Sequence, residues 1–525
     1  MNIKHLLAGI CAAMLCLNTG CGSDGKQYDI VIYGGNCAGI MAAVQAKKMG
    51  KSVIVLEQLD RIGGLTTGGL GEVDHGKKSS IGGLAMEYFT RVGAKYGSDE
   101  AFFKFEPKVA LEVFQDYVRE FDIPVVYEEL IDLQNGVEKE GNRIVAIKME
   151  SGNVYRGRMF IDASYEGDLM AVAGVSYTYG REGNAMYGET NNGIRANGAD
   201  EIPYGIDPYI VPGDKSSGLL PRVNPTRGGN VGDGDKGIQA YCYRMCLTND
   251  PENRIMVEKP EGYNELEYEL MLRCMQSDEM AVWRCFKLSP MPHAKTDSNN
   301  NYGVSTDFNG GNQEYVNASH QRRAEIRKEH EIYQKGLVWT VQNHPRVPKR
   351  FKDFYAEWGL PKDEFTENGN WPQQIYIREC RRLLGEYLVT EHDCRREVLV
   401  DDPIAMGSYA MDSHHTQYFV NELGFVQPEG GFYDVLKTPY PVSYRAITPK
   451  EAECANLLVP VCVSATHAAF GSIRMEPVFM MMGQAAGMAA SMAIDGGTSV
   501  QKIEYPVLRK QLEAADFVLE AKPEE

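Results

Sequence analysis

The stretch Tyr28–Gln58 constrains the fold of this chain more than any other part of its sequence. It contains an apolar run at Asp29–Gly34, a segment of small residues at Ala38–Gly50, and a second apolar run at Lys51–Glu57. Such runs are typical of strands buried on both faces, and Gly50 stands where a glycine often ends a helix. The sequence therefore predicts a strand–turn–helix–strand unit, the context in which a glycine-rich loop binds a dinucleotide.

The turn of this unit reads GGNCAG. Gly34 permits a tight turn out of the strand, and Gly39 lets the helix approach the sheet closely. Asn36 replaces the usual second glycine, and asparagine tolerates left-handed backbone angles better than most residues. The helix N-terminus offers phosphates its N–H groups and the positive end of its dipole. Glu57, at the end of the second strand, would accept hydrogen bonds from both ribose hydroxyls, so we predict a bound dinucleotide.

The following segment, Arg61–Gly83, is unusually rich in glycine: RIGGLTTGGLGEVDHGKKSSIGG. A flexible linker would have a similar glycine content, but the embedded Leu, Ile and Val residues favour an ordered loop. Each missing Cβ allows the backbone to lie nearer to a ligand. The segment therefore indicates a long, flat and largely buried cofactor rather than a nicotinamide unit.

These motifs carry a resemblance to a known family. The glutamate followed by RIGG resembles the phosphate-binding region of glutathione-reductase-like FAD proteins. The segments YGGNCAGI, GGLTTGGLG, Phe160–Glu182 and Asn456–Gly487 are similar to the bacterial FAD-dependent oxidoreductases, some of which are labelled xanthan lyase. The resemblance covers most of the chain from residue 28 onward and implies that the cofactor is FAD. The implied cofactor-binding residues are Gly34, Gly35, Asn36, Cys37, Ala38, Gly39, Glu57, Gly63, Gly64, Leu65, Ala163, Asp168, Met482 and Gln484.

Two regions near the predicted flavin need comment. Ile144–Met170 alternates as a hairpin followed by a strand that ends near Asp162. In the wider FAD fold this strand ends in Ala-Thr-Gly, whereas here Tyr165 replaces the glycine and must point away or shape the site. Asp168 either caps the next helix or contacts the cofactor. The resemblance also implies that the N-terminal end of a late helix, near Met482–Gln484, faces the isoalloxazine and stabilises reduced flavin through its dipole.

The middle of the chain differs in composition, because clear strand–helix alternation disappears between about Arg181 and Tyr440. Helical patterns at Ala318–Gln342 and Pro372–Asp393 alternate there with polar loops. The predicted fold class is α/β: a Rossmann-type FAD-binding domain with a large inserted mixed α/β substrate domain. The predicted division is a signal or lipoprotein segment at 1–21, FAD-binding parts at 28–180 and 441–498, the inserted domain at 181–440, and a C-terminal helix or tail at 499–525. Asn456–His467 is expected to be a strand that returns to the cofactor.

The candidate catalytic residues are His414, His467 and Arg474. His414 follows Asp412, which could orient the imidazole as a base for a substrate hydroxyl. His467 and Arg474 flank the predicted flavin, where the arginine could hold a carboxylate, pair with a glutamate or stabilise negative charge on the flavin. Each residue could instead be a structural histidine or a simple ion pair. The amide-rich segment Asp297–Asn312 is either a surface loop or a pocket wall that binds sugar hydroxyls.

A metal site is not predicted, because Asp297–Asn312 lacks the glutamate of a calcium loop and the cysteines show no zinc-like spacing. Nine cysteines lie beyond the N-terminal segment, and we expect single buried thiols. With 54 Lys+Arg against 72 Asp+Glu, the formal charge of −18 argues against nucleic acid and anionic membrane surfaces as partners.

The first residues predict export. Leu6–Leu17 has the length of a signal h-region, and Gly20–Cys21 followed by a polar tether resembles a bacterial lipoprotein processing site, although Asn18 stands where an aliphatic residue is usual. A buried N-terminal helix is the alternative. We therefore expect an exported protein, periplasmic or on the cell surface, with a lipid anchor to the membrane at Cys21.

The predicted function is hydride transfer between flavin and an alcohol or ketone of a polar small molecule, possibly a sugar or glycoside. The sequence has no evident second dinucleotide fingerprint, which favours a bound substrate over a nicotinamide coenzyme. Two alternatives stay open: a non-redox lyase or hydrolase that acts on glycans with flavin bound, and a surface lipoprotein that binds glycan.

Overall fold

The computed structural model describes residues 26–196, 202–280, 285 and 287–521. The segment Leu6–Leu17 and the residue Cys21, on which the predictions of export and lipid anchoring depend, lie outside the described residues. The nine cysteines within them are all buried free thiols, as predicted.

A seven-stranded sheet forms the base of the molecule. Its order is β3-β2-β1-β6-β5-β4, and β21 adds to β6. The strands are β1 Gln27–Tyr33, β2 Val53–Leu56, β3 Val125–Val126, β4 Val137–Glu140, β5 Arg143–Lys148, β6 Val154–Asp162 and β21 Leu457–Leu458. β1 runs parallel to β2 and β6, whereas β4, β5 and β6 are antiparallel neighbours. The predicted first unit and the predicted hairpin are both confirmed.

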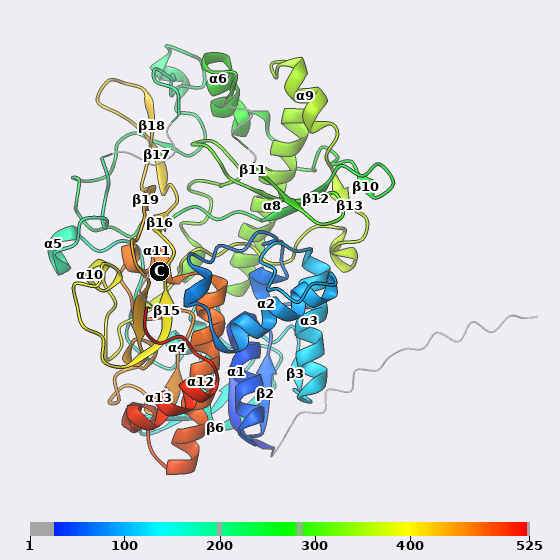
Figure 1. Cartoon of the computed structure of the whole chain (residues 1–525). Coiled ribbons are helices and arrows are strands. Elements are labelled where there is room, and N and C mark those ends of the chain that lie inside the picture. The colour runs from blue at the N-terminus through cyan, green and yellow to red at the C-terminus, as the bar shows by residue number, and fades with distance from the viewer. Residues whose placement is uncertain (1–25, 197–201, 281–284, 286, 522–525) are drawn as a thin grey trace, which may run out of the picture.

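The first helix, α1 (Cys37–Lys48), crosses between β1 and β2 and packs against the late helix α12 (Glu476–Gly496). The contact is close, because a Cβ at Gly483 would lie 2.2 Å from the Ala38 carbonyl oxygen. Figure 1 shows α1 in blue beside α12 in orange, so the two ends of the chain form one body. α12 has the length and hydropathy of a membrane-crossing helix, but 94% of its apolar window is buried inside the protein, as in a core helix.

Five further helices complete this part of the molecule. They are α2 Gly83–Lys95, α3 Pro107–Glu120, α4 Asp168–Val172, α11 His467–Ile473 and α13 Tyr505–Ala514. The small sheets β15–β20 (Pro403–Gly407 with Tyr440–Ser443) and β16–β19 (Met411–Ser413 with Phe432–Asp434) lie beside α11 and α12. Side chains of these strands, such as Ile404 and Met411, belong to the same hydrophobic core as α1 and α12.

A second hydrophobic core lies in the upper half of Figure 1 and draws on residues between Ile206 and Val426. Its main elements are the antiparallel sheet β11-β12-β9 (Lys287–Met291, Lys295–Asn299, Met245–Thr248) and the helices α6 Glu269–Ser277, α8 His320–Asn343 and α9 Lys349–Tyr355. α8 confirms the helix predicted from Ala318 to Gln342. The remaining short helices and strands of the described chain are α5 Asn184–Tyr187, α10 Glu391–Cys394, β7 Tyr177–Thr178, β8 Val223–Asn224, β10 Arg254–Ile255, β13 Leu360–Pro361, β14 Arg382–Leu383, β17 Gln417–Val420 and β18 Val426–Glu429. The division of the chain into an FAD domain and an inserted domain stays a prediction.

The helix predicted over Pro372–Asp393 is wrong, because this segment is mostly extended. Tyr376 forms a backbone bridge with Cys242, and β14 pairs with β7. The guanidinium groups of Arg378 and Arg382 are buried and donate to backbone carbonyls of distant segments. Buried charges need such tertiary partners, and these override the local helix propensity.

The strand expected over Asn456–His467 is much shorter than predicted. Only Leu457 and Leu458 pair with β6. Beyond them the backbone N–H of Val459 donates to the Ile447 carbonyl at 2.9 Å, so the chain leaves the sheet and bonds to another segment. Pro460 also lacks the N–H that a continuing strand would need.

Candidate active site

The β1–α1 loop meets two other segments at the carboxyl end of the sheet. The N–H of Gly63 donates to the Gly35 carbonyl at 2.8 Å. The side-chain amide of Asn36 donates to the carbonyl of Ala163, and its oxygen accepts from the N–H of Gly39 at 3.1 Å. Asn36 thus caps α1 and ties the loop to the end of β6, two roles that need a side chain. Its φ of −70° is not left-handed, so the reason expected for asparagine at this position is wrong.

Glu57 lies at the end of the neighbouring strand and faces this loop. Its carboxylate accepts from the N–H of Gly35 at 2.6 Å and from the N–H of Leu59 at 2.8 Å. Burial raises the pKa of Glu57 to about 7 and outweighs these two hydrogen bonds, which lower it. A carboxylate can accept about four hydrogen bonds, so Glu57 retains capacity for the ribose hydroxyls of a dinucleotide.

The glycine-rich loop Arg61–Gly83 is ordered, but some of its glycines serve a purpose that the sequence did not reveal. A Cβ at Gly69 would lie 1.9 Å from the Arg244 carbonyl oxygen, and a Cβ at Gly71 would lie 1.8 Å from the sulfur of Met291. These two glycines therefore allow the loop to pack against the second core rather than against a ligand.

A buried polar group surrounds Tyr165 near the Gly63–Gly64 turn. The hydroxyl of Tyr165 accepts from the N–H of Leu65 at 3.0 Å and donates to the carboxylate of Glu476 at 3.0 Å. Thr66 donates to the other oxygen of the same carboxylate. Burial raises the pKa of Glu476 above its usual value. Tyr165 therefore shapes the site, and Glu476, considered in the sequence only as a partner of Arg474, places the N-terminus of α12 beside the dinucleotide loop.

The remaining predicted cofactor residues divide into two sets. Cys37 and Ala38 open α1, and the thiol of Cys37 donates to the Glu476 carbonyl at 3.7 Å. Met482 and Gln484 lie in the second and third turns of α12, which begins at Glu476. Gln484 accepts from the N–H of Leu84 at 2.8 Å, so its side chain joins α12 to α2.

Asp168 is the first residue of α4, and Gly167 is the cap, so the expected capping role is wrong. Its buried carboxylate accepts from Arg323 at 2.6 Å and from Arg381 at 2.7 Å. Despite burial, these two guanidinium groups lower the pKa of Asp168. The residue therefore links α4 to α8 and to the extended segment that contains Arg381.

The predicted catalytic residues His414 and Arg474 lie in one buried cluster. His414 contacts Asp307 through Nδ1 at 2.6 Å and approaches Asp412 with Nε2 at 3.6 Å. Arg474 pairs with Asp412 at 2.7 Å and donates to the hydroxyl of Tyr376 at 2.8 Å. Burial lowers the pKa of His414, but the two carboxylates outweigh it and raise that pKa overall. The two carboxylates therefore favour the imidazolium form more than water does, and both ring nitrogens are directed at them.

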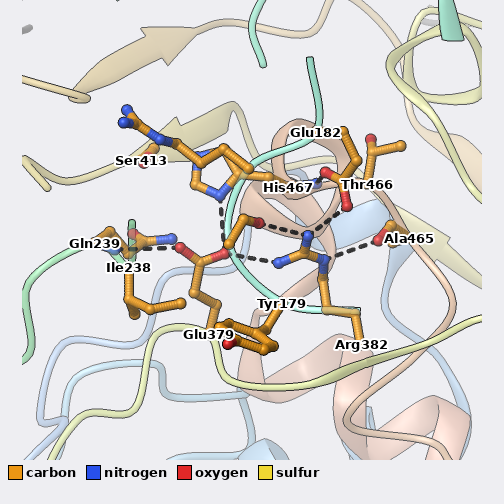
Figure 2. Close-up of polar contacts among 12 residues, drawn as sticks. Tyr179, Glu182, Ile238, Gln239, Glu379, Arg382, Ser413, Ala465, Thr466 and His467 are labelled. Atoms are coloured by element: carbon orange, nitrogen blue, oxygen red, sulfur yellow. Dashed lines mark hydrogen bonds and ion pairs between the residues drawn. The ribbon is translucent and has the colours of Figure 1, made fainter. Parts of the chain in front are cut away.

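His467 lies in a second buried cluster, which Figure 2 shows. Its Nδ1 contacts the carboxylate of Glu379 at 2.8 Å, and Arg382 donates to the same carboxylate at 3.0 Å. Burial by itself raises the pKa of Glu379. His467 and Arg382 lower this pKa by more than burial raises it, so its net value is about 2. Nε2 of His467 has no hydrogen-bond partner among the described residues. An ionised carboxylate on Nδ1 fixes the tautomer in which Nε2 carries a lone pair.

One glutamine joins the two clusters. The side-chain oxygen of Gln239 accepts from the backbone N–H of His414 at 3.1 Å, and the backbone N–H of Gln239 donates to the carboxylate of Glu379 at 3.3 Å. Sequence reasoning missed Gln239, Glu379 and Asp307. Asp307 lay within the amide-rich segment singled out as a pocket wall, whereas Glu379 was hidden in the segment read as a helix.

A family model described as FAD dependent oxidoreductase matches residues 29–512. The chain belongs to this family. FAD is its cofactor, and the protein is a member of an FAD-dependent oxidoreductase family. The geometry fits this group: the N-terminus of α1 would receive the phosphates, Glu57 has acceptor capacity for ribose, and the Gly63–Gly64 turn lies against the first loop.

Comparison with solved structures finds partial matches to flavoenzymes. A flavin monooxygenase variant from Stenotrophomonas maltophilia is 17% identical, over 30% of this chain and 42% of that one, with a TM-score of 0.21. The L-amino acid deaminase from Proteus vulgaris is 15% identical, over 30% of this chain and 53% of that one, with a TM-score of 0.23. The matches thus span about half or less of these proteins. A comparison with curated proteins finds no match.

Proposed function

We propose that this enzyme transfers hydride between FAD and an alcohol or ketone carbon of a polar, carbohydrate-like small molecule. The observation that carries the proposal is a set of buried polar atoms without hydrogen-bond partners among the described residues. These atoms are Gln239 Nε2, Asn312 Oδ1, His415 Nε2, Thr416 Oγ1 and His467 Nε2. They gather around the segment Ile238–Tyr241, which bonds to Asn312 and to His415, the neighbour of Thr416, and which Glu379 connects to His467.

A buried polar atom without a partner costs about 1–3 kcal/mol. Five of them in one region therefore call for a partner rich in hydrogen-bonding groups, and the hydroxyls of a sugar supply both donors and acceptors. Four of the five residues lie between 181 and 440, which supports the proposal that this middle segment is the substrate domain.

We assign the proton transfer to His467. When bound, FAD supplies the hydride chemistry. Oxidation of an alcohol also requires a base for the hydroxyl proton, and Nε2 of His467 is a buried acceptor that Glu379 holds in the correct tautomer (Figure 2). His414 lacks such an acceptor, because both of its nitrogens face carboxylates. With Arg474, it instead holds positive charge next to Tyr376 and orients the surrounding side chains.

A screen of anaerobic flavin bleaching tests this function. Sugars, uronates and their keto forms are mixed with the FAD-loaded enzyme without oxygen, and loss of the oxidised-flavin absorbance is followed by stopped flow. We expect a sugar-like alcohol to bleach the flavin, and His467→Gln to slow that reaction by about 10²–10⁴-fold with FAD retained. His293→Gln is the matched control, because the His293 side chain is 69% exposed. Bleaching at the wild-type rate in His467→Gln would remove this histidine from the reaction, and no bleaching by any alcohol would contradict the proposed function.

We also propose that the protein is exported and anchored by lipid at Cys21. The support is the apolar run Leu6–Leu17 and the small residue before the cysteine. Mass spectrometry of the N-terminal peptide after expression in a bacterial host tests this. A diacylated cysteine at position 21 is expected, and an unprocessed Met1 would contradict it.

A further inference from the structure

A second polar site lies next to His467. A cavity of about 700 Å³ is lined by Asn184, Thr190, Asn191, Arg195, Phe432 and Asp434, among others. This volume is within the range of small-molecule sites, about 300–1,000 Å³. The lining thus offers amide groups, a guanidinium and aromatic rings, the side chains with which proteins bind small polar ligands.

The cavity adjoins the proposed proton acceptor. The ring of Phe432 lies edge-on to the imidazole of His467, with centroids 6.0 Å apart. Asn192 is also in the cavity wall. Its side-chain oxygen accepts from the N–H of Ala468, the residue after His467, at 2.7 Å. The ring of Phe432 would thus lie between His467 and a ligand that fills the cavity.

Arg195 is the charged group of this cavity that lacks an ionic partner. Its guanidinium lies 4.9 Å above the ring of Phe432 and donates only to the carbonyl and side-chain oxygens of Asn191, at 3.2 and 3.4 Å. In the part of the chain that the structure describes, no carboxylate lies within 4.0 Å of it. A partly buried guanidinium without a counter-ion retains donors in a fork that matches a carboxylate.

The carboxylates nearest the cavity pair with other arginines. Asp434 pairs with Arg395 and accepts from the amide of Asn191 at 2.8 Å. Glu429, behind the cavity, pairs with Arg181 at 2.6 Å. Each of these arginines is shared with a second carboxylate, Arg395 with Glu391 and Arg181 with Asp235, so Arg195 is the guanidinium of the cavity that has no ion pair among the described residues. Its single fork of donors suits one carboxylate, and the neighbouring acidic side chains disfavour the nearly doubly charged phosphate monoester.

We propose that this cavity binds the carboxylate of an acidic sugar, with Arg195 as the specificity residue. The proposal rests on the proposed function, because it makes a uronate-bearing saccharide the preferred substrate of the enzyme. Phe432 provides an apolar face for the sugar ring, and Asn184 and Asn191 provide amides for its hydroxyls.

Calorimetry with the FAD-loaded enzyme tests the cavity without any redox step. Glucuronate and glucose are the probes, and inorganic phosphate is a third. We expect glucuronate to bind more tightly than glucose and phosphate. Arg195→Met should weaken the binding of glucuronate by about 10- to 100-fold, as expected for a lost charged hydrogen bond. The affinity for glucose should change by less than about 2-fold. The glucuronate affinity of Arg195→Lys should lie between those of the wild type and Arg195→Met, because lysine retains the positive charge but not the forked pair of donors. Arg119→Met, on an exposed side chain of α3, is the matched control.

The outcomes separate the two proposals. Loss of glucuronate binding in Arg195→Met supports the carboxylate site, even if no sugar bleaches the flavin. Equal losses of glucuronate and glucose binding in Arg195→Met, or tighter binding of phosphate than of glucuronate, would overturn the carboxylate site. Either result leaves the proposed function standing if sugars still reduce the enzyme.

Discussion

Glu57 predicts that the affinity for FAD depends on pH near neutrality. The buried carboxyl has a pKa of about 7, compared with 4.5 for an ordinary glutamate, because burial outweighs its two backbone hydrogen bonds. The ribose hydroxyls of FAD donate to the ionised form and so favour it. Below pH 7 the Glu57 carboxyl of the free protein is mostly protonated, and it must lose this proton before it can accept hydrogen bonds from both ribose hydroxyls. FAD affinity should therefore fall as the pH drops below about 7.

The size of this effect follows from the two pKa values. One pH unit corresponds to about 1.4 kcal/mol. If bound FAD restores an ordinary glutamate pKa, the difference between 7 and 4.5 corresponds to about 3 kcal/mol. The dissociation constant should then rise by close to tenfold per pH unit below pH 7, and by on the order of 10²-fold in all.

Glu57→Gln isolates the contribution of the carboxylate. At pH 8 the variant should bind FAD about 10- to 100-fold more weakly, because it loses charged hydrogen bonds. At pH 5.5 the two proteins should bind FAD with similar affinity, because the free wild-type carboxyl is then largely protonated and must lose its proton on binding. The assay is calorimetric titration of the FAD-free protein across this range, with Glu128→Gln on an exposed neighbour as the control. Parallel pH profiles for wild type and Glu57→Gln would refute the reasoning.

Two further substitutions test the packing around the site by denaturant unfolding. Gly69→Ala should destabilise the protein by more than about 2 kcal/mol, because φ is 114° and the new Cβ would lie 1.9 Å from the Arg244 carbonyl oxygen. Gly97→Ala, with φ of 75° and open space, should cost only about 1–2 kcal/mol, and equal effects would contradict the packing argument. Asp168→Asn should cost about 3–5 kcal/mol, since it leaves two buried arginines without their shared counter-ion, and a loss below 1 kcal/mol would show that Arg323 has other adequate partners.

Local sequence patterns were sufficient to predict the elements whose structure depends on neighbouring residues in the chain. The β1–α1–β2 unit follows from two apolar runs, a glycine turn and a small-residue helix, all within about thirty residues. α12 begins and ends where its pattern predicts, because Pro477 suits the first helical turn and Gly497 adopts the left-handed C-cap. FAD binding could be predicted for the same reason, since the phosphate site is made of a loop and a helix end that are adjacent in sequence.

The sequence by itself thus determined the cofactor and the unit that binds it. Only the tertiary structure decided which side chains surround His467. Glu379 reaches it from 88 residues away, in a segment whose local pattern predicts a helix. Arg195 and Phe432 meet across a cavity wall although they are far apart along the chain. Buried charges are stable only beside partners of suitable sign and geometry, and sequence spacing carries no information about which distant segment supplies them.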